Sequence, residues 1–161
     1  MYGFTFEQAL HMAASFGGGI GRMREICGAA CGMFLLAGLE RCAVEGADRE
    51  GKAANYKLVQ ELAEKFKEEC GTIHCSELLG LSKKEPIVAT PDARTAQYYA
   101  KRPCARMVET AARIWGDFLE NEGKLLIRSC FLGCKMKVFL FFLHVFSCFL
   151  LILPQFNARQ V

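Results

Sequence analysis

Residues 16–39 constrain the fold of this chain more than any other stretch, because a glycine run there leads into an almost entirely apolar helix. Glycine gives the backbone access to conformations that other residues rarely adopt, so the run is expected to form a tight turn. From about residue 23 to residue 39 the pattern is helical, and it is nearly apolar from Ile26 onward. A helix that is hydrophobic on all sides is buried. We therefore predict that residues 23–39 form the central helix of a small bundle.

Two further helices are indicated by their first residues. Thr5 and Gln8 have the spacing of a capping box, which predicts a short helix over residues 6–15. Pro103 suits the first turn of a helix, so a helix is expected to follow it, with Cys104 at its start.

A fourth helix is predicted from periodicity. Apolar side chains, including Tyr56, Leu62 and Phe66, recur at helical spacing opposite charged ones, which indicates an amphipathic helix of about 18 residues. Residues 82–98 carry two prolines and several charges, and are expected to form a surface loop. The fold class is therefore all-α, with one helical domain over residues 1–123.

The cysteines are the residues most able to carry chemistry. Nine cysteines is a high number for 161 residues. The chain does not open on a signal-peptide pattern, so a cytoplasmic location is expected, and in that reducing compartment cysteine indicates metal ligation, redox chemistry or simple burial. Cys75 and Cys104 are expected at helix starts, where unpaired amides favour the thiolate.

The spacing of the cysteines does not decide between these roles. It matches neither zinc-ribbon nor ferredoxin motifs, and a single cysteine is most often a small buried hydrophobe. Five cysteines from three segments of the body nevertheless form a candidate set for a metal or redox centre: Cys27, Cys31, Cys70, Cys75 and Cys104.

Four sequence elements follow one another along the chain: FGGGIG at residues 16–21, CGAACG at residues 27–32, CSELLG at residues 75–80 and a helix-opening cysteine, Cys104. In this order they resemble the C_GCAxxG_C_C family, whose members are proposed to be redox-active. The resemblance covers roughly residues 6–119. It implies a small all-helical bacterial protein, linked to oxidoreductase or transport functions, in which four cysteines hold a redox centre such as an iron–sulfur cluster.

Carried over residue by residue, the resemblance assigns the redox and metal-binding roles to Cys27, Cys75 and Cys104. The fourth family cysteine has no match, because it lies in a helix upstream of the glycine run and this chain is expected to begin after that point. Either the site lacks one ligand, or Cys31 or Cys70 replaces the missing sulfur as a further cofactor-binding residue.

The composition changes after residue 123. Residues 124–161 hold five basic residues, no acidic residue and 7 of the chain's 13 phenylalanines. An uncharged run that begins at Val138 and ends at Leu153 predicts an apolar helical segment of ~24 Å, somewhat short of the ~30 Å hydrocarbon core of a bilayer. Three alternatives stay open for this tail: a membrane-associated segment, a segment packed on the body, or a non-native extension.

Three functions from different classes follow. The first is a redox or metal-binding protein that uses the cysteine set with a partner that the sequence does not identify. The second is a non-catalytic helical packing module with inert buried cysteines, and the third is a membrane-associated version of either. A homodimer could supply missing ligands or cover the tail. The body is mildly acidic and has no basic patch interleaved with aromatic residues, so nucleic-acid binding is not expected, and the glycine run does not satisfy G-x-G-x-x-G.

Overall fold

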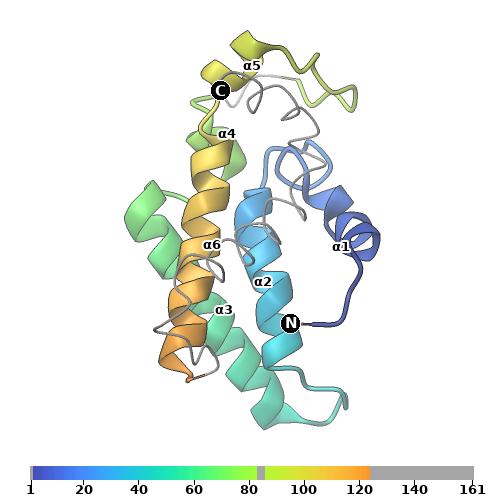
Figure 1. Cartoon of the computed structure of the whole chain (residues 1–161), viewed down its shortest axis with the longest axis vertical. Coiled ribbons are helices and arrows are strands. Elements are labelled where there is room, and N and C mark those ends of the chain that lie inside the picture. Colours follow the sequence, from blue (N-terminus) through green and yellow to red (C-terminus); the bar gives the residue numbers. More distant parts are fainter. Residues whose placement is uncertain (1, 83–85, 124–161) are drawn as a thin grey trace, which may run out of the picture.

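The computed structural model describes residues 2–82 and 86–123, and this part of the chain is helical (Figure 1). It contains six α-helices, one 3-10 turn and no β-strand, so the expected all-α fold is confirmed. In chain order the elements are α1 (Phe6–Ala13), the 3-10 turn η1 (Ala14–Phe16), α2 (Gly28–Glu40), α3 (Arg49–Cys70), α4 (Cys75–Leu78), α5 (Ala96–Ala100) and α6 (Cys104–Asn121).

Three long helices form the bundle. α2, α3 and α6 each pack against the other two, and Figure 1 shows them running along the long axis of the molecule. The short helices α4 and α5 lie at the end of the bundle where α2 and α6 begin. The largest fully buried side chains, Trp115 and Phe66, come from α6 and α3 and fill the space between the long helices.

The central helix is buried as predicted, but it begins five residues later than expected. Eight of the 13 residues of α2 are buried. The helix starts at Gly28, not residue 23, because Ile20, Arg22 and Arg24 adopt left-handed φ angles of 58°, 65° and 65°. A residue in that conformation cannot continue a right-handed helix. The glycine run and the residues that follow it therefore form one long loop.

The capping box of α1 is present as predicted. The Thr5 hydroxyl accepts a hydrogen bond from the Gln8 amide at 3.2 Å, and the Gln8 side chain accepts one from the Thr5 amide at 2.9 Å. Together they satisfy two amides that have no partner within the helix. The α-helix ends at Ala13, and η1 covers the remainder of the predicted segment.

The amphipathic helix α3 has 22 residues and is longer than predicted. The Asp48 side chain accepts a hydrogen bond from the Gly51 amide at 2.8 Å, and this cap lets the helix begin at Arg49. The prediction of Tyr56 on the apolar face is wrong, since that side chain is 61% exposed. The buried face instead follows the helical repeat back from Phe66 through Leu62 to Leu58.

The predicted tail over residues 124–161 lies outside the described residues, and so does its uncharged run from Val138 to Leu153. Among the helices that are described, none has the length and apolar character needed to cross a membrane.

Candidate functional site

The loop after η1 is held by its own backbone. The Gly21 amide donates to the Ser15 carbonyl at 2.7 Å, and the Glu25 amide donates to the Gly19 carbonyl at 3.1 Å. This folding needs left-handed φ angles at six positions, three of them glycines: Gly18, Gly19, Ile20, Gly21, Arg22 and Arg24. The glycine run therefore allows the tight turn that the sequence predicts. Ile20, Arg22 and Arg24 extend the same left-handed backbone conformation beyond the glycines.

The same loop is joined to α4. The Cys75 amide donates to the Glu25 carbonyl at 2.6 Å, and the Cys27 amide donates to the Ile73 carbonyl at 2.7 Å. Ile26 and His74 form an isolated antiparallel bridge between these two hydrogen bonds. Residues that are far apart in sequence, Cys27 and Cys75, are thereby placed on adjacent backbones.

Three of the five candidate cysteines stand at helix starts. Cys75 and Cys104 are the first residues of α4 and α6, as predicted. Cys27 is the N-cap of α2. The prediction that Cys27 lies inside a helix is wrong, because the loop with left-handed φ angles extends to Arg24 and α2 begins only at Gly28. All three line one pocket of about 300 Å³, together with the glycine run.

Burial dominates the acidity of these thiols. It raises the pKa of Cys27 from 9.0 to about 12, while the backbone amides of Ala29 and Ala30 act in the opposite direction. Negative charge on Cys75 or Cys104 raises the pKa of Cys27 further, which shows that the three thiols are within electrostatic reach of one another.

Arginines offset the effect of burial at the other two thiols. Burial raises the pKa of Cys75, and the charge of Arg24 and its hydrogen bond to the thiol oppose that shift, as does the charge of Arg102. At Cys104 burial again comes first, followed by charge on Cys75, and Arg102 and Arg24 again oppose the rise in pKa. The expectation that their positions at helix starts make Cys75 and Cys104 more acidic is not met, because burial raises the pKa of both thiols by more than the arginines and, at Cys104, a backbone hydrogen bond lower it.

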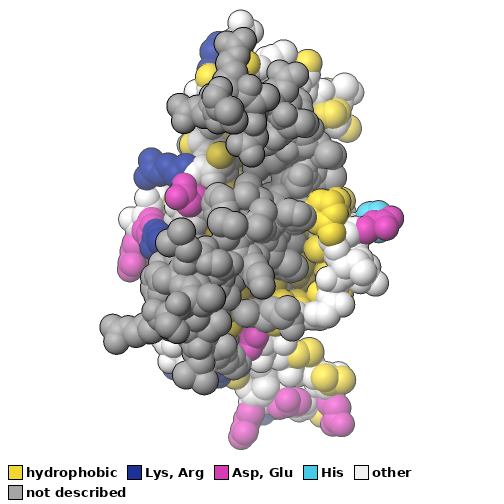
Figure 2. All heavy atoms as spheres, viewed as in Figure 1, with side chains coloured by type: hydrophobic (Ala, Val, Ile, Leu, Met, Phe, Trp, Pro, Cys, Tyr) yellow, Lys and Arg dark blue, Asp and Glu magenta, His cyan; other side chains and the backbone are white. Residues whose placement is uncertain are grey.

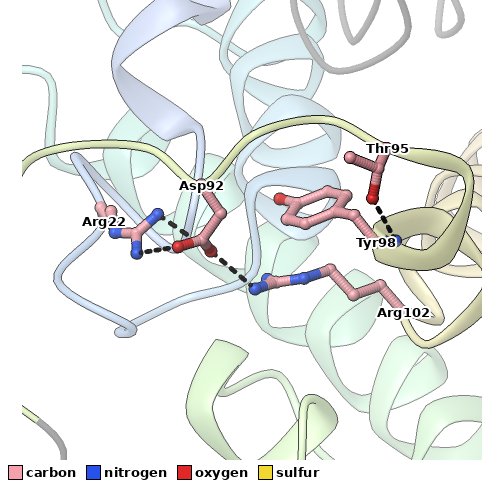
Figure 3. Close-up of polar contacts among 5 residues, drawn as sticks. All are labelled: Arg22, Asp92, Thr95, Tyr98 and Arg102. Carbon is pink, nitrogen blue, oxygen red and sulfur yellow. Dashed lines mark hydrogen bonds and ion pairs between the residues drawn. The ribbon is translucent and has the colours of Figure 1, made fainter.

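The pocket carries more positive than negative charge. Four arginines and one aspartate line it: Arg22, Arg24, Arg94, Arg102 and Asp92. The Asp92 carboxylate accepts two hydrogen bonds from Arg22, at 3.0 and 3.3 Å, and one from Arg102 at 3.1 Å (Figure 3). The Arg22 hydrogen bonds hold the pKa of Asp92 below its ordinary value, so the carboxylate stays ionised.

The segment before α6 contributes to the pocket, which the sequence pattern does not indicate. Thr95 caps α5 by accepting a hydrogen bond from the Tyr98 amide at 3.2 Å, and the Arg102 guanidinium lies 4.2 Å from the centre of the Tyr98 ring (Figure 3). The prolines and charges of residues 82–98 predict only a surface loop. They give no signal that Asp92 pairs with Arg22, which is 70 residues away in sequence.

One comparison with known proteins identifies the family. A family model described as "Putative redox-active protein (C_GCAxxG_C_C)" matches residues 1–118. The chain belongs to this family. No curated protein and no solved structure matches it. The resemblance inferred from the glycine run and the cysteine motifs is thus confirmed, and redox activity is the function described for the family.

Two cysteines that the sequence offers as substitutes in this C_GCAxxG_C_C protein lie away from the pocket lining. Cys31 is buried within α2, where burial raises its pKa to about 11. Cys70 is the last residue of α3, and a hydrogen bond with the Thr110 side chain partly offsets the effect of burial on its pKa. Neither residue is among those that line the pocket with Cys27.

The raised thiol pKa values of the C_GCAxxG_C_C protein predict a loss of stability at alkaline pH. Between pH 9 and about pH 11 the unfolded chain has released the Cys27 proton, whereas the folded chain, with a pKa of about 12, still holds it. The free energy of unfolding should therefore fall with rising pH, by up to about 1.4 kcal/mol per pH unit for one such thiol. Below pH 9 this contribution is constant. Denaturant unfolding across the window measures the slope.

Two variants serve as controls for that slope. Cys27→Ala should make the slope shallower by the share of one thiol, because the other buried thiols, such as Cys31 with a pKa of about 11, still titrate. Cys42→Ala removes an exposed thiol outside the core and should leave the slope unchanged. A Cys27→Ala protein whose stability falls with pH as steeply as the parent would contradict the linkage to Cys27.

Proposed function

We propose that the thiols of Cys27, Cys75 and Cys104 form a redox site that cycles between a dithiol and a disulfide. The observation that carries this proposal is their convergence: three separate helix starts present cysteines to one pocket, and their charges affect one another. Membership of a family described as redox-active supports the same conclusion.

The proposed reaction is thiol–disulfide exchange with a disulfide partner. One pocket thiolate attacks a sulfur of the partner, forming a mixed disulfide and releasing the first partner thiolate. A second pocket thiol loses its proton and attacks the mixed disulfide, which releases the second partner thiolate and leaves a protein disulfide. The partner gains two electrons, the protein loses two, and the two thiol protons pass to the partner sulfurs.

Cys75 is the thiol best placed to attack first. The thiolate is the nucleophile, so a nearby cation that stabilises it speeds the attack. Arg24 provides this effect by both its charge and a hydrogen bond, and Arg102 adds to it. Cys27 lacks a cation among the causes of its pKa shift, and is better suited to the second step. Cys104 is acted on by the charges of Arg102 and Arg24, but the hydrogen bond from Arg24 goes to Cys75.

An iron–sulfur cluster is the other redox centre that the family resemblance implies. Within residues 2–82 and 86–123, no three histidine, cysteine, aspartate or glutamate side chains lie close enough together to hold a metal ion. The described site therefore does not fit a cluster by itself, and no step of the proposed exchange uses one. Cys130, Cys134 and Cys148 lie outside the described residues.

Oxidation of the reduced protein by glutathione disulfide tests this function. The expected product is one intramolecular disulfide between two of Cys27, Cys75 and Cys104, identified by peptide mapping after the free thiols are blocked. Cys42, which is exposed, provides the internal comparison for unspecific oxidation. Recovery of these three cysteines as free thiols, at a glutathione disulfide concentration that modifies Cys42, would exclude the proposed cycle.

A second candidate function, a non-catalytic helical module with inert cysteines, is favoured by one observation. Burial raises the pKa of all five candidate thiols. This alternative predicts that Cys75→Ala changes the stability but that no pocket thiol of the parent protein reacts with disulfides. The mapping experiment therefore separates the two functions directly.

A further inference from the structure

We propose that the pocket selects small disulfides that carry carboxylate groups, with Arg22 and Arg102 binding one carboxylate beside the thiols. This inference rests on the proposed function and adds the chemical class of the substrate. It starts from the charge of the pocket wall, where the described residues include Arg22, Arg24 and Arg102 and one aspartate, Asp92. The proposed exchange reaction alone does not require that excess of positive charge.

Asp92 shows the geometry that a substrate carboxylate would adopt. Its two oxygens accept hydrogen bonds from Arg22 and Arg102, which approach Asp92 from opposite sides (Figure 3). The planar guanidinium group matches a carboxylate in this two-pronged manner. Asp92 is an exposed residue, so a substrate carboxylate could replace it or share the two arginines without entering the core.

Arg102 is the arginine that both donates a hydrogen bond to Asp92 and acts on the thiols. Arg102 and Arg24 both act on the pKa of Cys75 and of Cys104. Arg22, Arg102 and the three thiols line the same pocket, so a carboxylate bound at the two arginines would share that pocket with the reacting sulfurs. Binding of the carboxylate and attack on the disulfide would take place in the same pocket.

The size of the pocket and the distribution of charge agree with a small anionic partner. A volume of about 300 Å³ is at the lower end of the range for small-molecule sites. One group of acidic side chains lies at the opposite end of the molecule (Figure 2), where the α2–α3 connection holds Glu45 and Asp48 and the first turn of α3 holds Glu50. The basic side chains of the pocket lining attract an anion to the thiol end of the molecule.

Three disulfides of similar size test the selectivity. Dithiodipropionate carries two carboxylates, hydroxyethyl disulfide is neutral and cystamine carries two ammonium groups. Each oxidation rate is divided by the rate at which the same disulfide oxidises mercaptoethanol, because the leaving thiols of the three disulfides differ in pKa and therefore in intrinsic rate. The divided rate of the reduced wild-type protein should be at least about tenfold higher with dithiodipropionate than with cystamine, and added salt should reduce the difference. Equal divided rates for all three would overturn the substrate class and leave the proposed redox function standing.

Binding without reaction is measured with suberate, in which two methylene groups replace the two sulfurs of dithiodipropionate. Calorimetry should show suberate binding that Arg22→Gln or Arg102→Gln weakens by about tenfold or more. Asp92→Asn removes the competing carboxylate and should tighten binding by at least about threefold. Arg41→Gln, which breaks an exposed ion pair with Glu122 at the other end of α2, should change nothing.

The two proposals fail in different ways. Suberate binding that is unaffected by Arg22→Gln and Arg102→Gln would overturn the inference, whatever the thiols do. Normal suberate binding together with pocket thiols that no disulfide oxidises would overturn the proposed redox function, and with it the assignment of a disulfide as the ligand. Opposite effects of Asp92→Asn and Arg22→Gln on binding would support the carboxylate site, because a loss of folding would move both in the same direction.

Discussion

Replacing Gly19 by alanine should destabilise the protein by about 2–5 kcal/mol, which is a large part of the stability of a small domain. A Cβ at this position would lie 2.5 Å from the Cβ of Cys75 and 3.0 Å from the Glu25 nitrogen. Neither neighbour can move freely, because the Cys75 amide is hydrogen-bonded to the Glu25 carbonyl. Gly19 also has a φ of +76°, which costs a residue with a side chain about 1–2 kcal/mol. Denaturant unfolding measures the sum.

Gly21→Ala is the matched control for this effect. Gly21 lies in the same loop with a φ of +56°, but no neighbouring atom lies within 4 Å of the point that a Cβ would occupy, so alanine there meets only the backbone cost. It should destabilise the protein by about 1–2 kcal/mol. Equal losses for the two variants would show that the close approach of the loop to Cys75 contributes nothing to stability.

Much of the fold follows from local signals in the sequence. The capping box of Thr5 and Gln8, the all-round apolar character of α2 and the position of Pro103 before α6 each depend on neighbouring residues, and each predicts a correct element. The placement of Cys75 and Cys104 at helix starts follows from the same kind of signal. Local hydrogen bonding and burial determine these features, so one short stretch of sequence is enough to predict them.

The parts of the site that the sequence does not predict depend on the backbone or on distant residues. Ile20, Arg22 and Arg24 are not glycines, so their identity does not indicate a left-handed φ angle. The sequence pattern therefore predicts that α2 begins too early, and it does not predict Cys27 as the N-cap. The pairing of Arg22 and Arg102 with Asp92 requires the fold that brings them together. A charge in a predicted loop does not reveal its partner.

Replacing Cys75 by serine should slow the formation of the mixed disulfide with glutathione disulfide by at least about tenfold. A hydroxyl does not attack a disulfide under these conditions, and the thiolate of Cys27 is scarce because burial raises its pKa to about 12. In the parent protein the rate should increase with pH up to the raised pKa of Cys75, since only the thiolate reacts. Alkylation of the remaining free thiols at a series of reaction times, followed by mass spectrometry, measures the rate. In the Cys42→Ser control, the pocket thiols should form the mixed disulfide at the parental rate.

Variants of the other two thiols separate attack from resolution. If Cys75 attacks first, the variant that lacks the second thiol should still form the mixed disulfide but should accumulate it, because nothing releases the bound glutathione. Both Cys27 and Cys104 interact electrostatically with Cys75, so either could be the second thiol. The serine variant of the second thiol should accumulate the adduct, and the serine variant of the remaining thiol should still form the protein disulfide. An adduct on Cys27 or Cys104 in the Cys75→Ser protein, formed at the parental rate, would assign the attack to a different thiol and leave Arg24 without a role in it.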